Sequence, residues 1–473
     1  MGSGISGISA GYHLGRHCPG RRYVVLEGRD DLGGTWDLFR YPGIRSDSDM
    51  HTLGYSFRPW TEDASIATGD SILQYLRSTA TEYGIDQHIR FGHRVTGARW
   101  SSADNRWRVE VRQGASGRTV ELTCNFMFLC CGYYDYAQGY TPDFPGTERF
   151  TGRIVHPQHW TEDIEYEGQR VVVIGSGATA VTLIPALAER AAHVTMLQRS
   201  PSYILSRPSQ DAIALWLGRI LPPRVAYRLT RWKNVTLGML IYSLCRRAPE
   251  HLRRMLIEGV REQLPPGYDV KTHFSPRYAP WDERLCLAPN GDLFEAIRDG
   301  RASVVTDHVE TFTERGILLR SGDELPADLI VTATGLQLRF LGGIDLEVDG
   351  QAVDLPDTMT YKAMMLSDVP NLALWTGYTN ASWTLKADLT GEYVCRLLNY
   401  MDDHGHRRFV PRCREPDMAQ TPLLDLKSGY IQRARAMMPK QGTKAPWRLR
   451  QSYLLDLLTL RYGAVNDEAM ELG

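Results

Sequence analysis

The class of fold follows from one stretch of the chain, Arg170-Val171-Val172-Val173-Ile174-Gly175-Ser176-Gly177-Ala178-Thr179-Ala180. Its β-branched run is typical of a buried parallel strand, and it leads into the pattern G-x-G-x-x-A and then into a helical pattern that extends to Ala188. In such units the glycines permit a tight turn and bring the backbone close to a pyrophosphate at the helix N-terminus. We therefore predict a Rossmann-like dinucleotide-binding domain around this loop.

A second copy of the glycine pattern opens the chain, at Gly2-Ser3-Gly4-Ile5-Ser6-Gly7. The next predicted strand ends at Glu27, a position at which a carboxylate binds a ribose hydroxyl. Only Met1 precedes this loop, whereas the central strand of a parallel sheet should precede it. We therefore expect the start of the chain to have been placed too late, or the chain to be truncated. A chain that starts at Met1 is expected to bind its cofactor poorly.

The two copies differ at the end of the strand that comes after each loop. In the copy at residues 175–180 this strand ends at Gln198-Arg199-Ser200 rather than at an acid. A carboxylate would bind a free ribose 2′-hydroxyl, whereas an arginine accommodates a 2′-phosphate through charge-assisted hydrogen bonds. The pair of loops therefore predicts FAD at the first and NADPH, in preference to NADH, at the second. An exposed arginine on an ordinary turn is the alternative for Arg199.

The composition excludes several classes of protein. The chain has 473 residues, 54 of them basic and 55 acidic, with 43% apolar residues, as in an ordinary globular protein. A net charge of −1 argues against a dedicated nucleic-acid binder. The eight cysteines form no C-x-x-C pair, so neither a metal site nor a dithiol redox couple is expected. No apolar run approaches the roughly 20 residues that span a bilayer. We expect a cytoplasmic enzyme.

Two further motifs narrow the chemistry. The first reads G-G-x-W-x-x-x-x-Y-P-G-x-x-x-D over residues 33–47, and the second reads F-x-G-x-x-x-H-x-x-x-W over residues 150–160. With them the sequence resembles class B flavoprotein monooxygenases of the flavin-containing monooxygenase superfamily, along essentially the whole chain. Within this class it is most similar to Baeyer–Villiger monooxygenases of the ethionamide-activating type. Thr161 stands where the second motif usually continues with Pro or Asp, which keeps N- and S-oxygenating relatives as an alternative.

The resemblance implies an FAD- and NADPH-dependent monooxygenase. Through a C4a-peroxyflavin it would insert one oxygen atom of O2 into a small hydrophobic ketone, giving an ester or lactone, with oxygenation of a sulfide or an amine as the alternative. An NADPH-dependent disulfide reductase is a further alternative, but it needs a cysteine pair that the sequence does not offer at a suitable spacing. A degenerate flavoprotein that binds nucleotide without turnover also remains open, because the first loop lacks its strand.

The resemblance also implies roles for single residues. Arg284 matches the family's active-site arginine, which stabilises negative charge on the reacting oxygen, and Asp47 matches the carboxylate that orients it. A surface salt bridge is the alternative for both. His156 is implied to control the geometry between the two domains. Glu283 stands where some relatives have a lysine, so Arg199 and Ser200 are expected to hold more of the 2′-phosphate.

The implied cofactor contacts fall into two sets. The FAD set comprises Gly2, Ser3, Gly4, Ser6, Gly7, Glu27, Gly34, Thr35, Trp36, Asp37, Leu38, Arg45, Ser46, Asp47 and Val95. The NADPH set comprises Gly175, Ser176, Gly177, Ala178, Thr179, Ala180, Arg199 and Ser200.

The predicted fold class is α/β, with two Rossmann-like domains and a helical insertion. We predict an FAD-binding domain over 1–146 plus 324–473, an NADP-binding domain over 147–206 plus 269–323, and the insertion over 207–268. Nine basic residues fall between Arg219 and Arg254, against the single acid Glu250, among many apolar residues. One interpretation is a helical lid on the nucleotide domains. The other is a basic amphipathic surface that contacts an anionic membrane.

Overall fold

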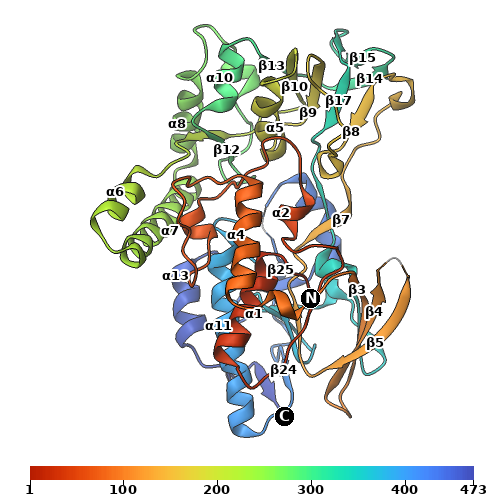
Figure 1. Ribbon diagram of the computed structural model, residues 1–473, viewed down its shortest axis with the longest axis vertical. Helices are drawn as coiled ribbons and strands as arrows, with labels where there is room; N and C mark the ends of the chain where they lie inside the picture. Colours follow the sequence, from red (N-terminus) through yellow and green to blue (C-terminus); the bar gives the residue numbers. More distant parts are fainter. Residues whose placement is uncertain (115, 425) are drawn as a thin grey trace.

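The second glycine loop lies in a parallel sheet at one end of the molecule (Figure 1). The computed structural model describes residues 1–114, 116–424 and 426–473. The sheet has the strand order β13-β10-β9-β17-β8. Its strands are β8 (Arg153–Val155), β9 (Arg170–Ile174), β10 (His193–Gln198), β13 (Ala302–Thr306) and β17 (Leu329–Thr332).

The two faces of this sheet explain the β-branched run in β9. Val171 and Val173 pack beneath the helices α5 (Ala178–Ala188) and α10 (Asp292–Arg298). Val172 and Ile174 pack on the other face, against an antiparallel sheet. That sheet consists of β14 (Val309–Thr313), β15 (Gly316–Leu319) and β16 (Glu324–Pro326). Strand β9 is thus covered on both sides, as central parallel strands are.

The first glycine loop lies in a separate domain with a shorter parallel core. Its helix α1 (Ile5–His17) packs beside the long helix α11 (Trp383–His404). Two small parallel sheets accompany them, β1 (Val25–Leu26) with β2 (Ile89–Arg90), and β6 (Met127–Leu129) with β23 (Leu372–Leu374).

Met1 and Gly2 connect these two small sheets. The amino group of Met1 donates to the carbonyl oxygen of Phe128 at 2.6 Å, and the amide of Cys130 donates to the carbonyl oxygen of Met1 at 2.8 Å. The amide of Gly2 donates to the carbonyl oxygen of Leu26 at 2.8 Å. The residue before the loop therefore lies between β6 and β1, where the sequence pattern requires a strand.

A five-stranded sheet, antiparallel except for the parallel pair β19–β3, and three helices also belong to the first domain. The sheet has the order β20-β19-β3-β4-β5, and its inner face buries Trp100 and Trp107. Its strands are β3 (His93–Ser101), β4 (Arg106–Gln113), β5 (Arg118–Cys124), β19 (Asp345–Val348) and β20 (Gln351–Ala352). The helices are α2 (Thr35–Leu38), α3 (Met50–Leu53) and α4 (Gly69–Glu82).

Two antiparallel strands, β7 (Tyr134–Gly139) and β18 (Leu336–Leu338), carry the chain between the domains. His156 lies at this crossing: its Nε2 is 3.1 Å from the carbonyl oxygen of Gly335, and its Nδ1 accepts from the amide of Gln158. The predicted boundary at residue 324 is wrong. Because β17 pairs with β8 and β9 of the second domain, the chain crosses back only at Gly335.

The segment 207–268 is mostly helical. It contains α6 (Ala212–Ile220), α7 (Pro223–Arg247) and α8 (Pro249–Arg261), and α6 and α7 stand out at one side of the molecule (Figure 1). Strands β11 (Ile204–Arg207) and β12 (Cys286–Pro289), which pair in parallel, and the short helix α9 (Val270–His273) flank it.

The C-terminal part adds short elements around α11. Three strand pairs are β21 (Thr360–Tyr361) with β22 (Met365–Leu366), β24 (Phe409–Pro411) with β27 (Met470–Leu472), and β25 (Gln420–Pro422) with β26 (Lys440–Gly442). Two short helices are α12 (Gly429–Ala434) and α13 (Tyr453–Asp456). Helix α13 continues as a wider π-helical segment, Leu457–Tyr462.

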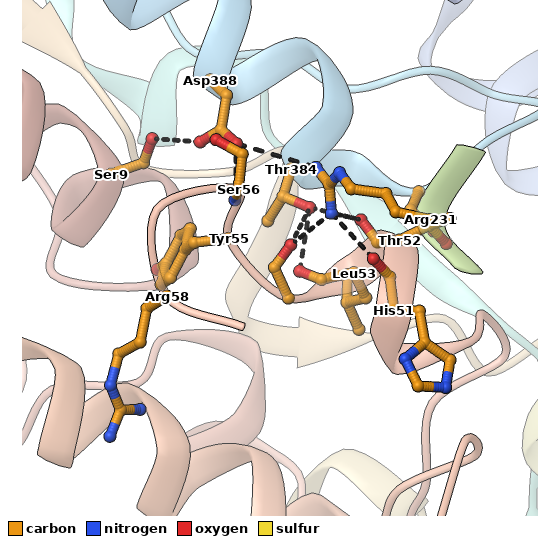
Figure 2. A network of polar contacts seen from close by, with 12 residues as sticks. Ser9, His51, Thr52, Leu53, Tyr55, Ser56, Arg58, Arg231, Thr384 and Asp388 are labelled. Carbon is orange, nitrogen blue, oxygen red and sulfur yellow. Dashed lines mark hydrogen bonds and ion pairs between the residues drawn. The ribbon is translucent and has the colours of Figure 1, made fainter. Parts of the chain in front are cut away.

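A buried arginine fixes α7 to the first domain (Figure 2). Arg231 donates from Nη1 to the carbonyl oxygens of His51 at 2.9 Å and Gly54 at 2.8 Å, where α3 ends, and its Nη2 lies 3.7 Å from a carboxylate oxygen of Asp388 on α11. Burial raises the pKa of Asp388, but His13, Arg231 and Ser56 lower it more, so the carboxylate stays charged. The insertion is therefore held by a paired interior charge.

Candidate functional site

A cavity of about 570 Å³ lies between the two domains. Both glycine loops contribute to its wall: Gly2, Gly4, Ile5 and Ser6 from the first, and Ala178, Thr179 and Thr182 from the start of α5. A cleft between two nucleotide-binding domains is the usual place for a ligand that both must reach.

The first loop fits the pyrophosphate of a dinucleotide. Helix α1 begins after Gly4 with no side-chain cap and no acid in its first turn, which leaves amide hydrogens for an anion. A Cβ on Gly7 would lie 1.9 Å from the carbonyl oxygen of Gly2, so only glycine permits this turn. The carboxylate of Glu27, which lines the cavity, accepts from the amide of Ser3 at 2.8 Å, from its hydroxyl at 2.9 Å and from the amide of Arg29 at 2.9 Å.

The second loop fits a dinucleotide in a different manner. Helix α5 also begins with no side-chain cap. Gly175 has a positive φ of 144°, and a Cβ there would lie 2.3 Å from the carbonyl oxygen of Ala333. A Cβ on Gly177, in contrast, would meet no protein atom within 4 Å, so the space beside it is open to a ligand. The hydroxyl of Ser176 donates to the carbonyl oxygen of Ser200 at 2.9 Å, which joins the loop to the turn after β10.

That turn exposes Arg199 and Ser200 at the second loop. Glu283 lies close enough to Arg199 to interact electrostatically: burial raises the pKa of the Glu283 carboxyl, and the arginine partly counteracts this. An acid is therefore present near the residues that are predicted to receive the 2′-phosphate.

Arg284 and Asp47, 237 residues apart in sequence, meet in the structure. Nη1 of Arg284 donates to Oδ2 of Asp47 at 3.2 Å. Arg284 lines the large cavity, and its exposed fraction of 37% faces that space. Burial lowers the pKa of Arg284, but Tyr133 and Asp47 outweigh this and hold it above its ordinary value, so the guanidinium stays protonated.

The loop before Arg284 is anchored from two sides by Asp282. Nη1 of Arg246, at the end of α7, lies 3.1 Å from one carboxylate oxygen, and Nζ of Lys427 lies 2.9 Å from the other. Trp281, one residue earlier, has a φ of 72°, an uncommon conformation for a side chain of this size. These contacts hold the position of Arg284 from both the insertion and the C-terminal part.

A second, smaller cavity of about 50 Å³ adjoins the first across Arg284. Arg284, Tyr133, Tyr378 and Trp383 line both cavities. The rest of its wall is mostly apolar and includes Phe340, Trp375, Leu423, Leu424, Leu426, Ile431, Met438 and Leu449. Sequence reasoning missed these residues. The signal for Tyr133 was its place just after the strand β6, since the carboxyl ends of parallel strands carry sites. For the leucines no local pattern distinguishes them from core residues.

The predicted cofactor residues divide into two groups. Those that line the large cavity are Gly2, Gly4, Ser6, Glu27, Gly34, Thr35, Trp36, Arg45, Ser46, Asp47, Val95, Ala178 and Thr179. Ser3, Gly7, Asp37, Leu38, Gly175, Ser176, Gly177, Ala180, Arg199 and Ser200 do not line it.

Several of these side chains have other partners. Asp37 is buried and accepts from Arg29 at 2.5 Å and from Arg40 at 2.7 Å, and Leu38 packs into the core of the second domain. Arg45 lines the cavity, but its guanidinium forms an ion pair with Asp292 at the start of α10. The side chains of Asp37 and Leu38 thus have partners within the protein, and Arg45 connects the two domains. The cofactor contacts predicted for these residues stay predictions.

This architecture is shared with solved monooxygenases. A steroid monooxygenase bound to NADP matches with a TM-score of 0.77 and 22% identity, over 100% of this chain and 98% of that one. Cyclohexanone monooxygenase bound to ε-caprolactone matches with a TM-score of 0.75 and 20% identity, over 100% and 98%. The predicted fold class, α/β with two Rossmann-like domains, is confirmed.

Sequence relatives define the family. The sequence pattern of the flavin-binding monooxygenase-like family matches residues 2–231. The FAD-containing monooxygenase EthA of Mycobacterium tuberculosis (strain H37Rv) is 56% identical over 471 residues, which cover 99% of this chain and 96% of that protein. The probable FAD-binding monooxygenase AlmA of Acinetobacter baylyi is 48% identical over 469 residues, covering 99% and 94%. The chain therefore belongs to the flavin-binding monooxygenases, and the predicted resemblance is confirmed.

Proposed function

We propose that this protein is an FAD- and NADPH-dependent monooxygenase that inserts one oxygen atom of O2 into ketones. The first loop and Glu27 would hold FAD, and the second loop with Arg199 would hold NADPH. When bound and reduced, the flavin supplies the activation of O2. This chain supplies position, charge and exclusion of water.

Arg284 carries this proposal. Its guanidinium lies between the cavity that both glycine loops line and the smaller apolar cavity. A fixed cation at this junction stabilises negative charge that develops on an oxygen during attack on a carbonyl carbon. Asp47 orients the guanidinium through the 3.2 Å contact. Because Arg284 stays protonated, it stabilises this charge over the working pH range.

The smaller cavity favours an uncharged, hydrophobic substrate. Leucine, isoleucine, methionine and aromatic side chains dominate its wall, and a site of this composition binds through burial of apolar surface. The cyclohexanone monooxygenase structure of the same fold holds ε-caprolactone, a lactone. We expect the same class of product, an ester or lactone, here. Oxygenation of a sulfide or an amine is the second candidate, and it depends less on a cation beside a carbonyl.

The test compares Arg284→Ala and Arg284→Lys with the unaltered protein on one ketone and one sulfide of similar size. We expect ester formation to fall by about 10²–10³-fold in Arg284→Ala, the usual cost of losing one oxyanion donor. Sulfide oxygenation should fall less than tenfold, and Arg284→Lys should retain part of the ketone activity. Flavin absorbance of each purified variant controls for cofactor loss. Equal losses on both substrates would reject the proposed role, as would ketone activity that survives in Arg284→Ala.

A further inference from the structure

Helix α7 exposes many of its large apolar side chains to solvent, while its buried side carries polar as well as apolar residues. Its buried residues are Ala226, Tyr227, Thr230, Arg231, Asn234, Val235 and Cys245. Its exposed residues include six large apolar side chains with exposed fractions of 41–55%, namely Val225, Leu229, Trp232, Leu237, Leu240 and Leu244. A helix on a water-exposed surface usually turns its large apolar side chains toward the core and keeps its outer side polar. The outer side of α7 is therefore suited to an apolar environment.

The exposed apolar residues of α7 share one side of the helix. Val225, Leu229 and Trp232 are separated by four and three residues, and Leu240 and Leu244 follow after eight and four more. At 3.6 residues per turn these steps return to the same side. Arg231 points the other way, into the network of Figure 2, and this contact sets the rotation of the helix.

The apolar stripe continues onto two neighbouring elements. Helix α6 exposes Ile213, Trp216 and Ile220, with exposed fractions of 52–58%. The segment from α13 onward exposes Leu454, Leu455, Leu458 and Tyr462, with exposed fractions of 40–71%. Figure 1 shows α13 beside α7, and the rings of Trp232 and Tyr453 lie 5.9 Å apart. We call this surface of α6, α7 and 454–462 the apolar face. Exposed apolar surfaces of this extent mark interaction sites.

The charge around the apolar face is of one sign. Residues 212–249 contain seven basic side chains and no acidic one. Arg231 is buried, while Lys233 and Arg246 are paired with Asp211 and Asp282. The other four, Arg219, Arg224, Arg228 and Arg247, are exposed, and no ion pair joins them to any of the residues that the structure describes. A second copy of the chain would bring the same charges to this face and be repelled, whereas an anionic partner would be attracted.

We propose that the apolar face binds the surface of an anionic lipid bilayer, with α6 and α7 lying in the headgroup region. Apolar side chains flanked by arginines are the combination that binds such surfaces. Within the described part of the chain, no helix is both long and apolar enough to cross a membrane, so the contact is peripheral.

The apolar face is rigidly supported and close to the site. Asp456 on α13 accepts from Nζ of Lys386 at 2.7 Å and from the hydroxyl of Tyr378 at 2.8 Å. Tyr378 lines both cavities. One hydrogen bond therefore separates the proposed docking surface from the wall of the site, which places a lipid phase next to a cavity that favours apolar substrates.

The test is flotation of the purified protein with vesicles of equal parts phosphatidylglycerol and phosphatidylcholine, compared with pure phosphatidylcholine. We expect binding to the anionic vesicles at low salt, and loss of that binding at high salt. Leu229→Glu/Leu240→Glu should weaken binding at least tenfold. Arg219→Gln/Arg228→Gln should weaken it by about fivefold for each charge removed. Phe91→Glu is the matched control, because Phe91 is 39% exposed and precedes β3, on the other side of the molecule in Figure 1, and it should bind normally.

Three results would overturn the proposal. The first is no flotation with anionic vesicles at low salt. The second is equal binding by Leu229→Glu/Leu240→Glu and Phe91→Glu. The third is a dimer in sedimentation without lipid that Leu229→Glu/Leu240→Glu converts to a monomer, because a second copy would then cover this face. None of these readouts depends on the monooxygenase reaction, so they stand apart from the proposed function.

Discussion

The two glycine loops have nearly the same sequence pattern but differ in how the protein surrounds them. At the first loop Ser3 is fully buried and holds Glu27 through two hydrogen bonds, and the carbonyl of Gly2 closes against Gly7. At the second loop the space beside Gly177 is open, and the residues after the next strand, Arg199 and Ser200, are exposed. The residues of the first loop are buried or half-buried, while Gly177 and Ala178 of the second loop are exposed.

This difference matches what the two cofactors must do under the proposed function. A flavin that stays bound through many turnovers is best held in an enclosed site, where desolvation strengthens each polar contact. A nicotinamide cofactor must enter and leave, which an open loop permits. The charge of the residue that follows the next strand then selects between two ligand groups. Glu27 is suited to a ribose hydroxyl, and Arg199 to a phosphate.

The largest expected effect comes from adding one methyl group to each loop in turn. Gly7→Ala places a Cβ 1.9 Å from the carbonyl oxygen of Gly2, so the turn cannot close and the purified protein should lose its bound flavin. Gly177→Ala meets no protein atom within 4 Å and should retain flavin, while its methyl group hinders NADPH. The visible absorbance spectrum measures the first effect, and the KM for NADPH measures the second. Flavin loss from Gly177→Ala, or retention of flavin by Gly7→Ala, would contradict the assignment of FAD to the first loop.

Arg199→Ala sharpens the contrast at the open site. Loss of charge-assisted hydrogen bonds to a 2′-phosphate should raise the KM for NADPH by about tenfold to a hundredfold, leaving the KM for NADH and the flavin content unchanged. Arg190→Ala is a suitable control, because Arg190 is an exposed arginine of the same domain that pairs with Glu167. Parallel increases for NADPH and NADH would mean that Arg199 does not contact the phosphate.

A smaller effect is expected at Glu283, the acid near Arg199. Glu283→Lys replaces a negative with a positive charge beside the 2′-phosphate, which should lower the KM for NADPH by roughly fivefold. Glu283→Gln removes the negative charge without adding a positive one, so it should change the free energy of NADPH binding by about half as much. An unchanged KM in both variants would place Glu283 outside the NADPH site.

The smallest effect concerns His156, which joins the two domains. Burial lowers its pKa, and the hydrogen bond to Gly335 only partly restores it. Above its ordinary pKa of about 6.5 the imidazole is neutral in both the folded and the unfolded protein. Because its pKa is lower in the folded protein, the unfolded chain binds the proton first as the pH falls. The free energy of unfolding therefore decreases toward low pH. We expect His156→Gln to reduce the loss of stability between about pH 7 and pH 5 by about 1 kcal/mol or less. Denaturant unfolding at both pH values measures this, and an identical pH dependence would exclude the role.

Local patterns predicted the parts of the molecule that depend on local geometry. A window of about thirty residues is enough to recognise each of them. They are the run Val171–Ile174, the two glycine turns, and the charges of Glu27 and Arg199. The pairing of Asp47 with Arg284 came only from the family resemblance, since 237 residues separate them. Strand β17 was placed in the wrong domain, because strand pairing is a long-range property that its apolar composition does not encode.

The remaining parts depend on packing. Tyr378, Trp383 and the leucines of the small cavity have the composition of ordinary core residues, and only the folded structure shows that a cavity adjoins them. The sequence left the orientation of α7 open between a packed lid and an amphipathic surface that contacts a membrane. In the structure the buried contacts of Arg231 set the rotation of the helix, and six of its large apolar side chains are exposed.

Anaerobic titration of the purified, flavin-loaded protein with NADPH and with NADH tests the central claim most directly. If the two loops bind different cofactors that meet in one cavity, NADPH should bleach the flavin absorbance, NADH should do so far more slowly, and admission of air should restore the colour. Arg199→Ala should narrow the gap between the two nucleotides. Equal bleaching by NADPH and NADH, or no bleaching of a protein that demonstrably carries flavin, would contradict the assignment of FAD to the first loop and NADPH to the second.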